Sequence, residues 1–110
     1  METRLGRISH IEFGFGGYQD AQIGLSITIS GDGWGVADFR GDWGQGTKVG
    51  PHTKWTDAER DQRYADTVKY INGLLVDAKV RSVSDLRGKP VEVTLESNTL
   101  KSWRILTEVL

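Results

Sequence analysis

The chain of 110 residues has no cysteine and no long apolar run. Without cysteine it can form neither a disulfide scaffold nor a thiolate metal site, so an intracellular, cytoplasmic protein is the natural expectation. No window approaches the roughly twenty apolar residues of a membrane helix, and residues 1–7 lack the apolar run of a signal peptide. The sequence therefore predicts no membrane partner.

A surplus of either charge is missing as well. Lys and Arg number 14 and Asp and Glu number 15, which gives a formal net charge of -1. Proteins that coat nucleic acids need a basic surplus to displace counterions. We therefore expect no bulk nucleic-acid binding, although a local basic face remains open. The length fits a single domain, residues 1–110, with a modest core.

Signatures of catalysis are scarce. His10 and His52 are the only histidines, and neither has a second histidine or a carboxylate at helical ligand spacing. No serine lies in a nucleophile-elbow sequence, and no pair of acidic residues is fixed by its spacing on one element. We therefore expect a protein that is not an enzyme, with no catalytic residue, no metal and no cofactor.

Glycine, in contrast, is abundant. Most of the 14 glycines precede residue 51, where they alternate with strand-forming and aromatic residues such as Phe13, Phe15, Trp34, Phe39 and Trp43. Glycine weakens a strand. Repeated glycines of this kind therefore indicate bulges, sharp bends, or a ligand or second chain that lies against the main chain.

Alternating apolar and polar residues predict three strands in the first half. The first begins near Arg7 and runs through Phe15, the second covers residues 21–29, and the third covers residues 34–43. Residues 30–33, Ser-Gly-Asp-Gly, have the composition of a tight hairpin turn. We expect a three-stranded antiparallel meander.

The second half begins with a loop over residues 44–55, which ends at a helix start. Thr56 and Glu59 have the spacing of a capping box. One apolar stripe then recurs every three or four positions, at Tyr64, Val68, Ile71, Leu75 and Ala78. This spacing predicts one long amphipathic helix that packs on one face of the sheet.

Two more strands are expected after a short helical turn at residues 82–88. Pro90 opens the first of them. The last strand carries apolar residues on both faces: Trp103, Ile105, Thr107 and Val109 on one, Leu106 and Leu110 on the other. Together with the glycine-rich strands, this surplus predicts a homo-oligomer. The predicted fold is α+β, an antiparallel sheet in the order βββαββ along the chain.

Seven residues are candidates for ligand binding: Tyr18, Gln19, Asp20, Trp34, Arg40, Trp43 and Arg104. Tyr18, Gln19 and Asp20 lie at the tip of a glycine-rich turn. A strand follows that turn, which is the wrong context for a nucleotide phosphate loop, but loop tips on a rigid sheet commonly bind ligands. The tryptophans are either core aromatics or a stacking platform for a planar ligand such as a base. The arginines are either solvated surface charge or contacts to an anion.

Two stretches of the sequence resemble small uncharacterised accessory proteins encoded by bacteriophages and prophages. The first runs from residues 16–22 into residues 33–39, and the second joins residues 90–94 to residues 98–109. The resemblance implies a phage origin and the cytoplasm of a host cell, and it brings no catalytic residue. Accessory phage proteins in this setting include counter-defence proteins, among them inhibitors of CRISPR complexes and sponges for nucleotide immune signals.

Three functions are compatible with these features. The leading hypothesis is a non-catalytic counter-defence sponge, in which glycine-lined strands, an aromatic ring and a few cations enclose a nucleotide-like small molecule. The second is a protein–protein inhibitor that docks on a host defence complex by edge pairing or by shape. The third is a phage structural or assembly component.

Overall fold

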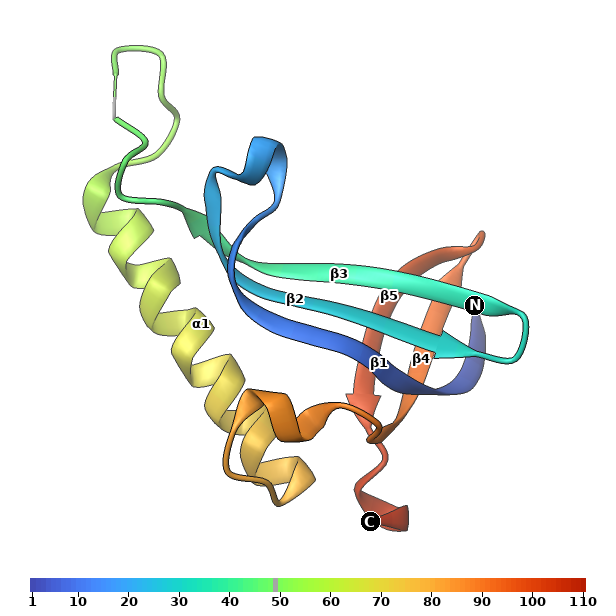
Figure 1. The fold of residues 1–110 in the computed structure, drawn as a ribbon. Helices are drawn as coiled ribbons and strands as arrows, with labels where there is room; N and C mark the ends of the chain where they lie inside the picture. The colour runs from blue at the N-terminus through green and yellow to red at the C-terminus, as the bar shows by residue number, and fades with distance from the viewer. Residues whose placement is uncertain (49) are drawn as a thin grey trace.

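A computed structural model describes residues 1–48 and 50–110. Five strands form one antiparallel sheet in the order β3-β2-β1-β4-β5 (Figure 1). The strands are β1 (Glu2–Gly16), β2 (Gln22–Gly31), β3 (Trp34–Trp43), β4 (Pro90–Glu96) and β5 (Thr99–Ile105). The helix α1 (Asp57–Ala78) follows β3 in the chain, and three short 3-10 helices are η1 (Tyr18–Asp20), η2 (Val83–Leu86) and η3 (Thr107–Val109). This confirms the predicted α+β fold and the βββαββ order. No helix within the described residues is long and apolar enough to cross a membrane.

Strand β1 lies at the centre of the sheet and pairs with a strand on each side. Its second half pairs with β2, and its first half, up to Arg7, pairs with β4. A register shift between Ile8 and His10 marks the change of partner. The prediction that this strand begins near Arg7 was wrong, since β1 begins at Glu2. The sequence gives no sign of this start, because residues 2–6 show no apolar alternation and Leu5 is mostly exposed.

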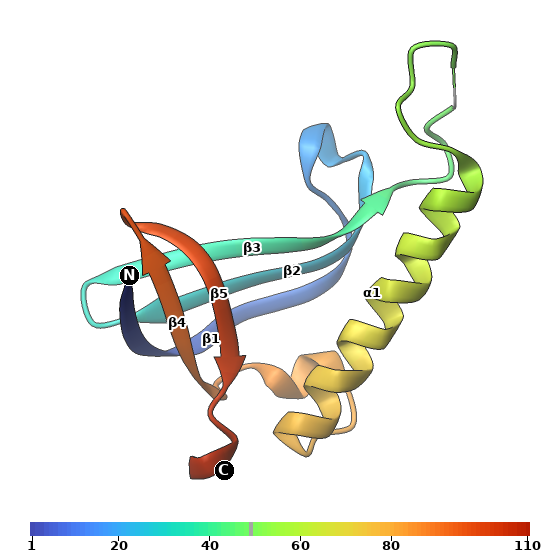
Figure 2. The same ribbon diagram turned by 180° about the vertical axis from the view of Figure 1, so that it is seen from behind.

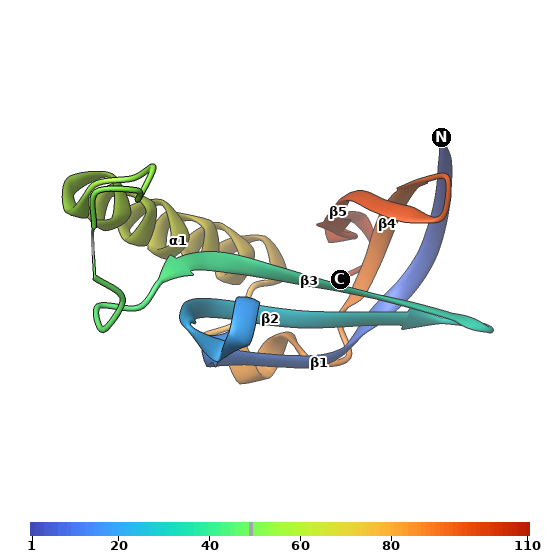
Figure 3. The ribbon, with the colours of Figure 1, turned by 90° about the horizontal axis from the view of Figure 1, so that it is seen from above.

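The sheet curls around β1, so that β4 and β5 cross the layer formed by β2 and β3 (Figures 2 and 3). β3 and β5, the two ends of the sheet, approach each other but form no ladder in the part of the chain that the structure describes. The result is a five-stranded, partly open barrel, with α1 between β3 and β4 in the chain. Its core holds Ile8, Leu25, Ile27, Ile29, Leu74, Ala78, Leu86, Val91, Val93, Leu95 and Ile105.

A row of glycines crosses the sheet near one end. Gly14, Gly24 and Gly41 are register partners on β1, β2 and β3, and we call them the glycine row. A Cβ atom on Gly24 would overlap the carbonyl oxygen of Arg40 and lie 2.7 Å from the Cα atom of Gly41. The strands curve strongly toward this end (Figure 1). Gly24 and Gly41 therefore allow the main chains of β2 and β3 to approach each other closely, whereas a side chain at Gly14 would meet nothing within 4 Å.

Helix α1 begins at the predicted cap. The Glu59 amide donates to the Thr56 hydroxyl at 3.1 Å, while that hydroxyl in turn lies 3.3 Å from the Glu59 carboxylate. The predicted apolar stripe was wrong at Val68, which is mostly exposed. The helix buries Ala78, as the stripe predicts, and it also buries Arg60, Thr67 and Leu74. Its C-terminal half therefore packs on the core, whereas its N-terminal half buries polar residues.

The last strand is shorter than predicted. β5 ends at Ile105, and Thr107 and Val109 lie in η3. Leu106 is only 9% exposed and its amide donates to the carbonyl oxygen of Pro90 at 3.0 Å, so it supplies no outward face for self-association. Leu110 is 43% exposed, so the homo-oligomer stays a prediction that keeps the support of Leu110 and loses that of Leu106.

Candidate functional site: the helix–sheet groove

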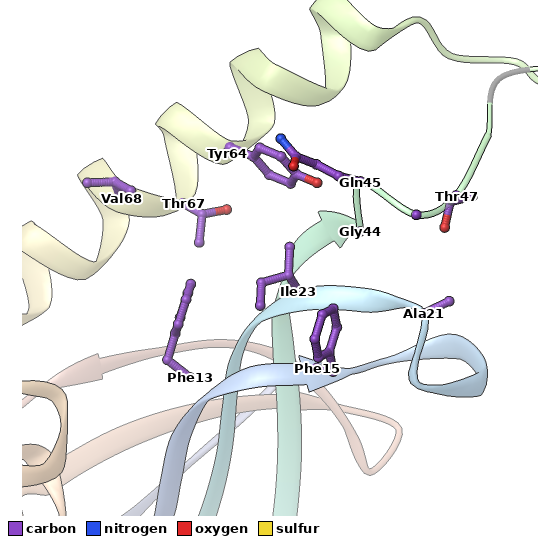
Figure 4. Close-up of a pocket in the computed structure, with 11 residues that line it drawn as sticks. Phe13, Phe15, Ala21, Ile23, Gly44, Gln45, Thr47, Tyr64, Thr67 and Val68 are labelled. Atoms are coloured by element: carbon purple, nitrogen blue, oxygen red, sulfur yellow. The ribbon is translucent and has the colours of Figure 1, made fainter.

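A groove opens between α1 and the end of the sheet that carries the glycine row (Figure 4). Its volume is about 540 Å³. The lining comes from β1, the start of β2, the segment after β3, and α1: Phe13, Phe15, Ala21, Ile23, Gly44, Gln45, Gly46, Thr47, Tyr64, Thr67 and Val68. We call this feature the helix–sheet groove.

Three large apolar side chains of the groove are exposed. Phe13 and Phe15 on β1 are 52% and 70% exposed, and Val68 on α1 is 64% exposed. Phe13 points from β1 toward the helix, and Thr67 points back toward it from the opposite wall (Figure 4). Scattered apolar residues are ordinary on a protein surface, but a concave cluster of them marks a binding site.

Arg60 ties the first turns of α1 to one wall of the groove. Its Nη1 donates to the carbonyl oxygens of Gly44 at 3.3 Å and Thr47 at 3.2 Å, and its Nη2 pairs with Asp57 at 3.0 Å. The guanidinium also lies 5.4 Å from the centroid of the Trp55 ring. Because Arg60 is only 7% exposed, water competes little for these bonds, and they fix the wall relative to the helix.

Two further polar contacts join α1 to the end of β3. The buried carboxylate of Asp42 accepts from Nη1 of Arg63 at 3.0 Å and from the Trp43 amide at 2.7 Å. The Tyr64 hydroxyl donates to the carbonyl oxygen of Trp43. Polar contacts thus connect the helix to the sheet beside the groove, which leaves its interior to apolar side chains.

The groove offers few polar atoms, and none of its described lining residues is charged. The hydroxyls of Tyr64 and Thr67 already donate to main-chain carbonyl oxygens, so toward a ligand they can only accept. The side-chain amide of Gln45 can donate. An uncharged ligand fits this lining, whereas a phosphate inside the groove would meet no cation.

The structure places the predicted ligand contacts from the first half at the two ends of β3. Tyr18 packs edge-on against Trp43, with 6.3 Å between the ring centroids, and Gln19 and Asp20 lie beside Tyr18 in η1. Trp34 lies at the opposite end of β3. Its ring would collide with a side chain at Gly31, so it acts there as a packing residue. Tyr18 contacts both Trp43 and Gln19, whose side-chain amide donates to the Tyr18 hydroxyl at 3.5 Å.

The two predicted arginines lie apart from these places. The Arg40 guanidinium is 4.2 Å from the centroid of the Tyr70 ring. Arg104 bonds Glu92 at 3.3 Å and both carboxylate oxygens of Glu108 at 3.0 and 2.9 Å. These bonds lower the pKa of Glu108 to about 2. Neither arginine lines the helix–sheet groove.

Sequence reasoning missed the residues that do line the groove. It assigned Phe13, Phe15 and Val68 to the core, because strand alternation and helical spacing do not reveal how far a helix stands from a sheet. One signal was available. Gly14 lies between Phe13 and Phe15 in the sequence, and a strand that bends at a glycine does not hold both neighbouring rings against one straight helix.

Comparison with known proteins adds no family: the chain matches no family model, no curated protein and no solved structure. Among the described residues, no group of three or more His, Cys, Asp or Glu could hold a metal ion. Barrel connectivity alone is compatible with many functions. The groove is therefore the feature from which we infer a function.

Proposed function

We propose that this is a non-catalytic binding protein whose helix–sheet groove holds an uncharged, largely apolar small molecule. One observation carries the proposal: the groove has a volume of about 540 Å³ and a described lining that is apolar and aromatic, without charge. Small-molecule sites have volumes of roughly 300–1,000 Å³ and combine such a lining with a few polar groups that fix the orientation.

The side chains of the groove favour a ligand that contains a ring. Phe13, Phe15 and Tyr64 present aromatic surface, and each aromatic contact contributes about 0.5–1.5 kcal/mol beyond the burial of area. A ligand donor would meet the oxygens of Tyr64 and Thr67, and a ligand acceptor would meet the Gln45 amide. The expected ligand is therefore planar, uncharged and sparsely polar.

The outward face of β2 and β3 agrees with the expectation of no bulk nucleic-acid binding, which stays a prediction. On β2, the positions that alternate with the buried Leu25, Ile27 and Ile29 carry Gln, Gly, Ser and Thr, and their partners on β3 are Gly, Ala, Phe and Trp. None of these outward positions carries Lys or Arg. A strand face without cations lacks the phosphate contacts that dominate such binding.

The hypotheses drawn from the sequence remain predictions. A nucleotide-like ligand would have to keep its phosphates outside the groove, because the lining offers no cation. A protein partner, an assembly role, a phage origin and host counter-defence have no further support here. The proposal keeps the non-catalytic small-molecule binder and changes the expected chemistry of its ligand.

Two valines on α1 provide a matched pair of variants for the test. Val68 is 64% exposed and Val76 is 67% exposed, yet only Val68 lines the groove. Both positions should accept aspartate without loss of the fold, since each side chain is mostly in water. Val68→Asp places a carboxylate that an apolar ligand would have to desolvate, and Val76→Asp does not.

The experiment measures thermal midpoints of the wild type and both variants against two sets of compounds. One set holds uncharged aromatic and alicyclic molecules, and the other holds mononucleotides, cyclic nucleotides and ADP-ribose. We expect a compound of the first set to raise the midpoint of the wild type and of Val76→Asp but not of Val68→Asp, because binding to the native state stabilises it. Binding by Val68→Asp equal to that by Val76→Asp contradicts the assignment, as does a response to phosphate-bearing compounds alone or to no compound.

A further inference from the structure

A second cavity lies at the open side of the barrel, where β3 and β5 approach each other beside α1. Its volume is about 170 Å³, and it shares no described lining residue with the helix–sheet groove. Asp38 and Arg40 enter it from β3, Tyr70 from α1, and Lys101 and Trp103 from β5. We call it the β3–β5 slot.

Arg40 enters the slot with its donors unused. Its guanidinium stacks on Tyr70 at 4.2 Å from the ring centroid, and among the described residues its side chain has no hydrogen bond or ion pair. Stacking occupies the face of the guanidinium and leaves the N–H groups along its edge available. That edge matches the two oxygens of a carboxylate.

Asp38 supplies the opposite charge on the same wall. It is half-buried and has no donor among the described residues. Because it precedes Arg40 by two positions on β3, both side chains lie on one face of the strand, with Cα atoms roughly 6.6 Å apart. The slot therefore presents one acceptor and one donor of opposite charge, neither of which has a partner within the described chain.

The other lining residues are two aromatic ones, Tyr70 and Trp103, together with Leu100, Lys101 and Ser102. Trp103 packs against the core, and Tyr70 is half-buried beside it in the slot. Burial raises the pKa of Tyr70 to about 12, so this ring stays neutral. Lys101 pairs with Glu96 at 3.4 Å. A ligand in the slot would meet the half-buried Asp38 and the exposed Arg40 on one side, and the rings of Tyr70 and Trp103 beside the polar Lys101 and Ser102 on the other.

We propose that the β3–β5 slot binds the zwitterion of a free α-amino acid with a short side chain. The carboxylate accepts from Arg40, the ammonium group donates to Asp38, and the side chain lies against Tyr70 and Trp103. An α-amino acid carries one positive and one negative charge, and the slot offers an opposite charge for each. An anion without an ammonium group would be repelled by Asp38.

The volume of the slot limits the ligand. An apolar cavity of about 150 Å³ is large enough for benzene. At about 170 Å³ the slot accommodates an amino acid the size of alanine, serine or valine, and it is too small for a nucleotide. This inference does not depend on the ligand of the helix–sheet groove.

The four tryptophans allow a test that reads both sites at once. Trp103 lines the slot, Trp43 and Trp55 contact residues beside the groove, and Trp34 lies at the far end of β3. Indole N–H signals of 15N-labelled protein, assigned with Trp-to-Phe variants, are followed during titration with alanine, serine or valine. Propionate and ethylamine serve as probes that carry only one of the two charges.

We expect a short-chain amino acid to shift the Trp103 signal saturably while the Trp34 signal stays in place. Propionate and ethylamine should bind about tenfold more weakly or worse, because each lacks one charge-assisted hydrogen bond. Arg40→Gln and Asp38→Asn should each weaken binding by a similar factor. Arg81→Gln, which changes an exposed arginine outside the slot, should leave it unchanged.

Three results would overturn the proposal. The first is the absence of a saturable shift of the Trp103 signal with all three amino acids up to about 10 mM. This concentration is well above a dissociation constant of about 1 mM, which corresponds to weak binding. The second is propionate binding as tightly as alanine. The third is unchanged binding by Asp38→Asn while its other indole signals show an intact fold.

Discussion

Replacement of Gly24 by alanine tests the account of the glycine row most directly. The new Cβ atom would overlap the carbonyl oxygen of Arg40 and lie 2.7 Å from the Cα atom of Gly41. Overpacking costs about 1–3 kcal/mol when side chains can yield. Here the colliding atoms belong to the main chain, so the upper end of that range applies. Alanine recovers only about 0.5–1 kcal/mol of strand propensity, which leaves a net loss of about 2 kcal/mol.

Gly14 provides the matched control, because it is the register partner of Gly24 on β1 and a Cβ atom there would meet nothing within 4 Å. Gly14→Ala should therefore be neutral or stabilising by about 0.5 kcal/mol. The assay is urea denaturation of the three proteins, supported by thermal midpoints. A loss of about 2 kcal/mol corresponds to a fall of roughly 10 °C for a domain of this size.

Equal stability of Gly24→Ala and the wild type, to within about 0.5 kcal/mol, would refute the reasoning, since it would mean that the strands do not touch at this point. A loss of similar size in Gly14→Ala would also contradict it, because the cost would then come from some general requirement for flexibility. A change in the slope of the urea transition would indicate an altered denatured state, so the comparison uses variants whose slopes agree.

Three further predictions concern the helix and the C-terminal segment. Thr56→Ala should lower the free energy of unfolding by about 1 kcal/mol in urea denaturation, because the Glu59 amide loses its cap. Arg60→Met should cost about 2–3 kcal/mol by the same measurement, because two carbonyl oxygens behind the groove lose a charged donor, and a cost below about 0.5 kcal/mol would contradict the buried contacts. The pKa of Glu108 in the folded protein is lowered from 4.5 to about 2 by Arg104, so its stabilising contribution is present above pH 4.5 and is lost as the pH falls toward 2. Glu108→Gln should remove this part of the acid dependence, as checked by urea midpoints at neutral pH and at about pH 3.

Local patterns predicted most of the framework because each depends on neighbours in the chain. The alternation in residues 21–29 and the turn composition of residues 30–33 were enough to define the β2–β3 hairpin, in which Gly31 pairs with Trp34. The capping box placed the start of α1. These signals come from the periods of strands and helices and from turn chemistry, which tertiary contacts rarely override when they agree with one another.

The groove could not be predicted in the same way, because it depends on distances between elements. Helical spacing placed Val68 with the core, but the N-terminal half of α1 is held by Arg60 and Arg63, whose partners lie in the loop and on β3. A buried arginine on a polar-looking helix face has no signature in hydrophobic periodicity. The first part of β1 escaped notice for a related reason: its pairing with β4 joins segments more than eighty residues apart.

The bend of the strands and the polar contacts between α1 and the sheet together explain why the helix–sheet groove stays open. Phe13 and Phe15 lie on either side of Gly14, so the bend at the glycine row directs their rings to different parts of one wall. Closing the gap would bury them, but Arg60 and Asp42 hold the helix through charged hydrogen bonds whose geometry fixes its distance from the sheet. Leaving Phe13 and Phe15 exposed costs about 25 cal/mol for each Å² that could have been buried. A ligand that covers Phe13 and Phe15 would bury this apolar surface and would thereby raise the free energy of unfolding of the protein.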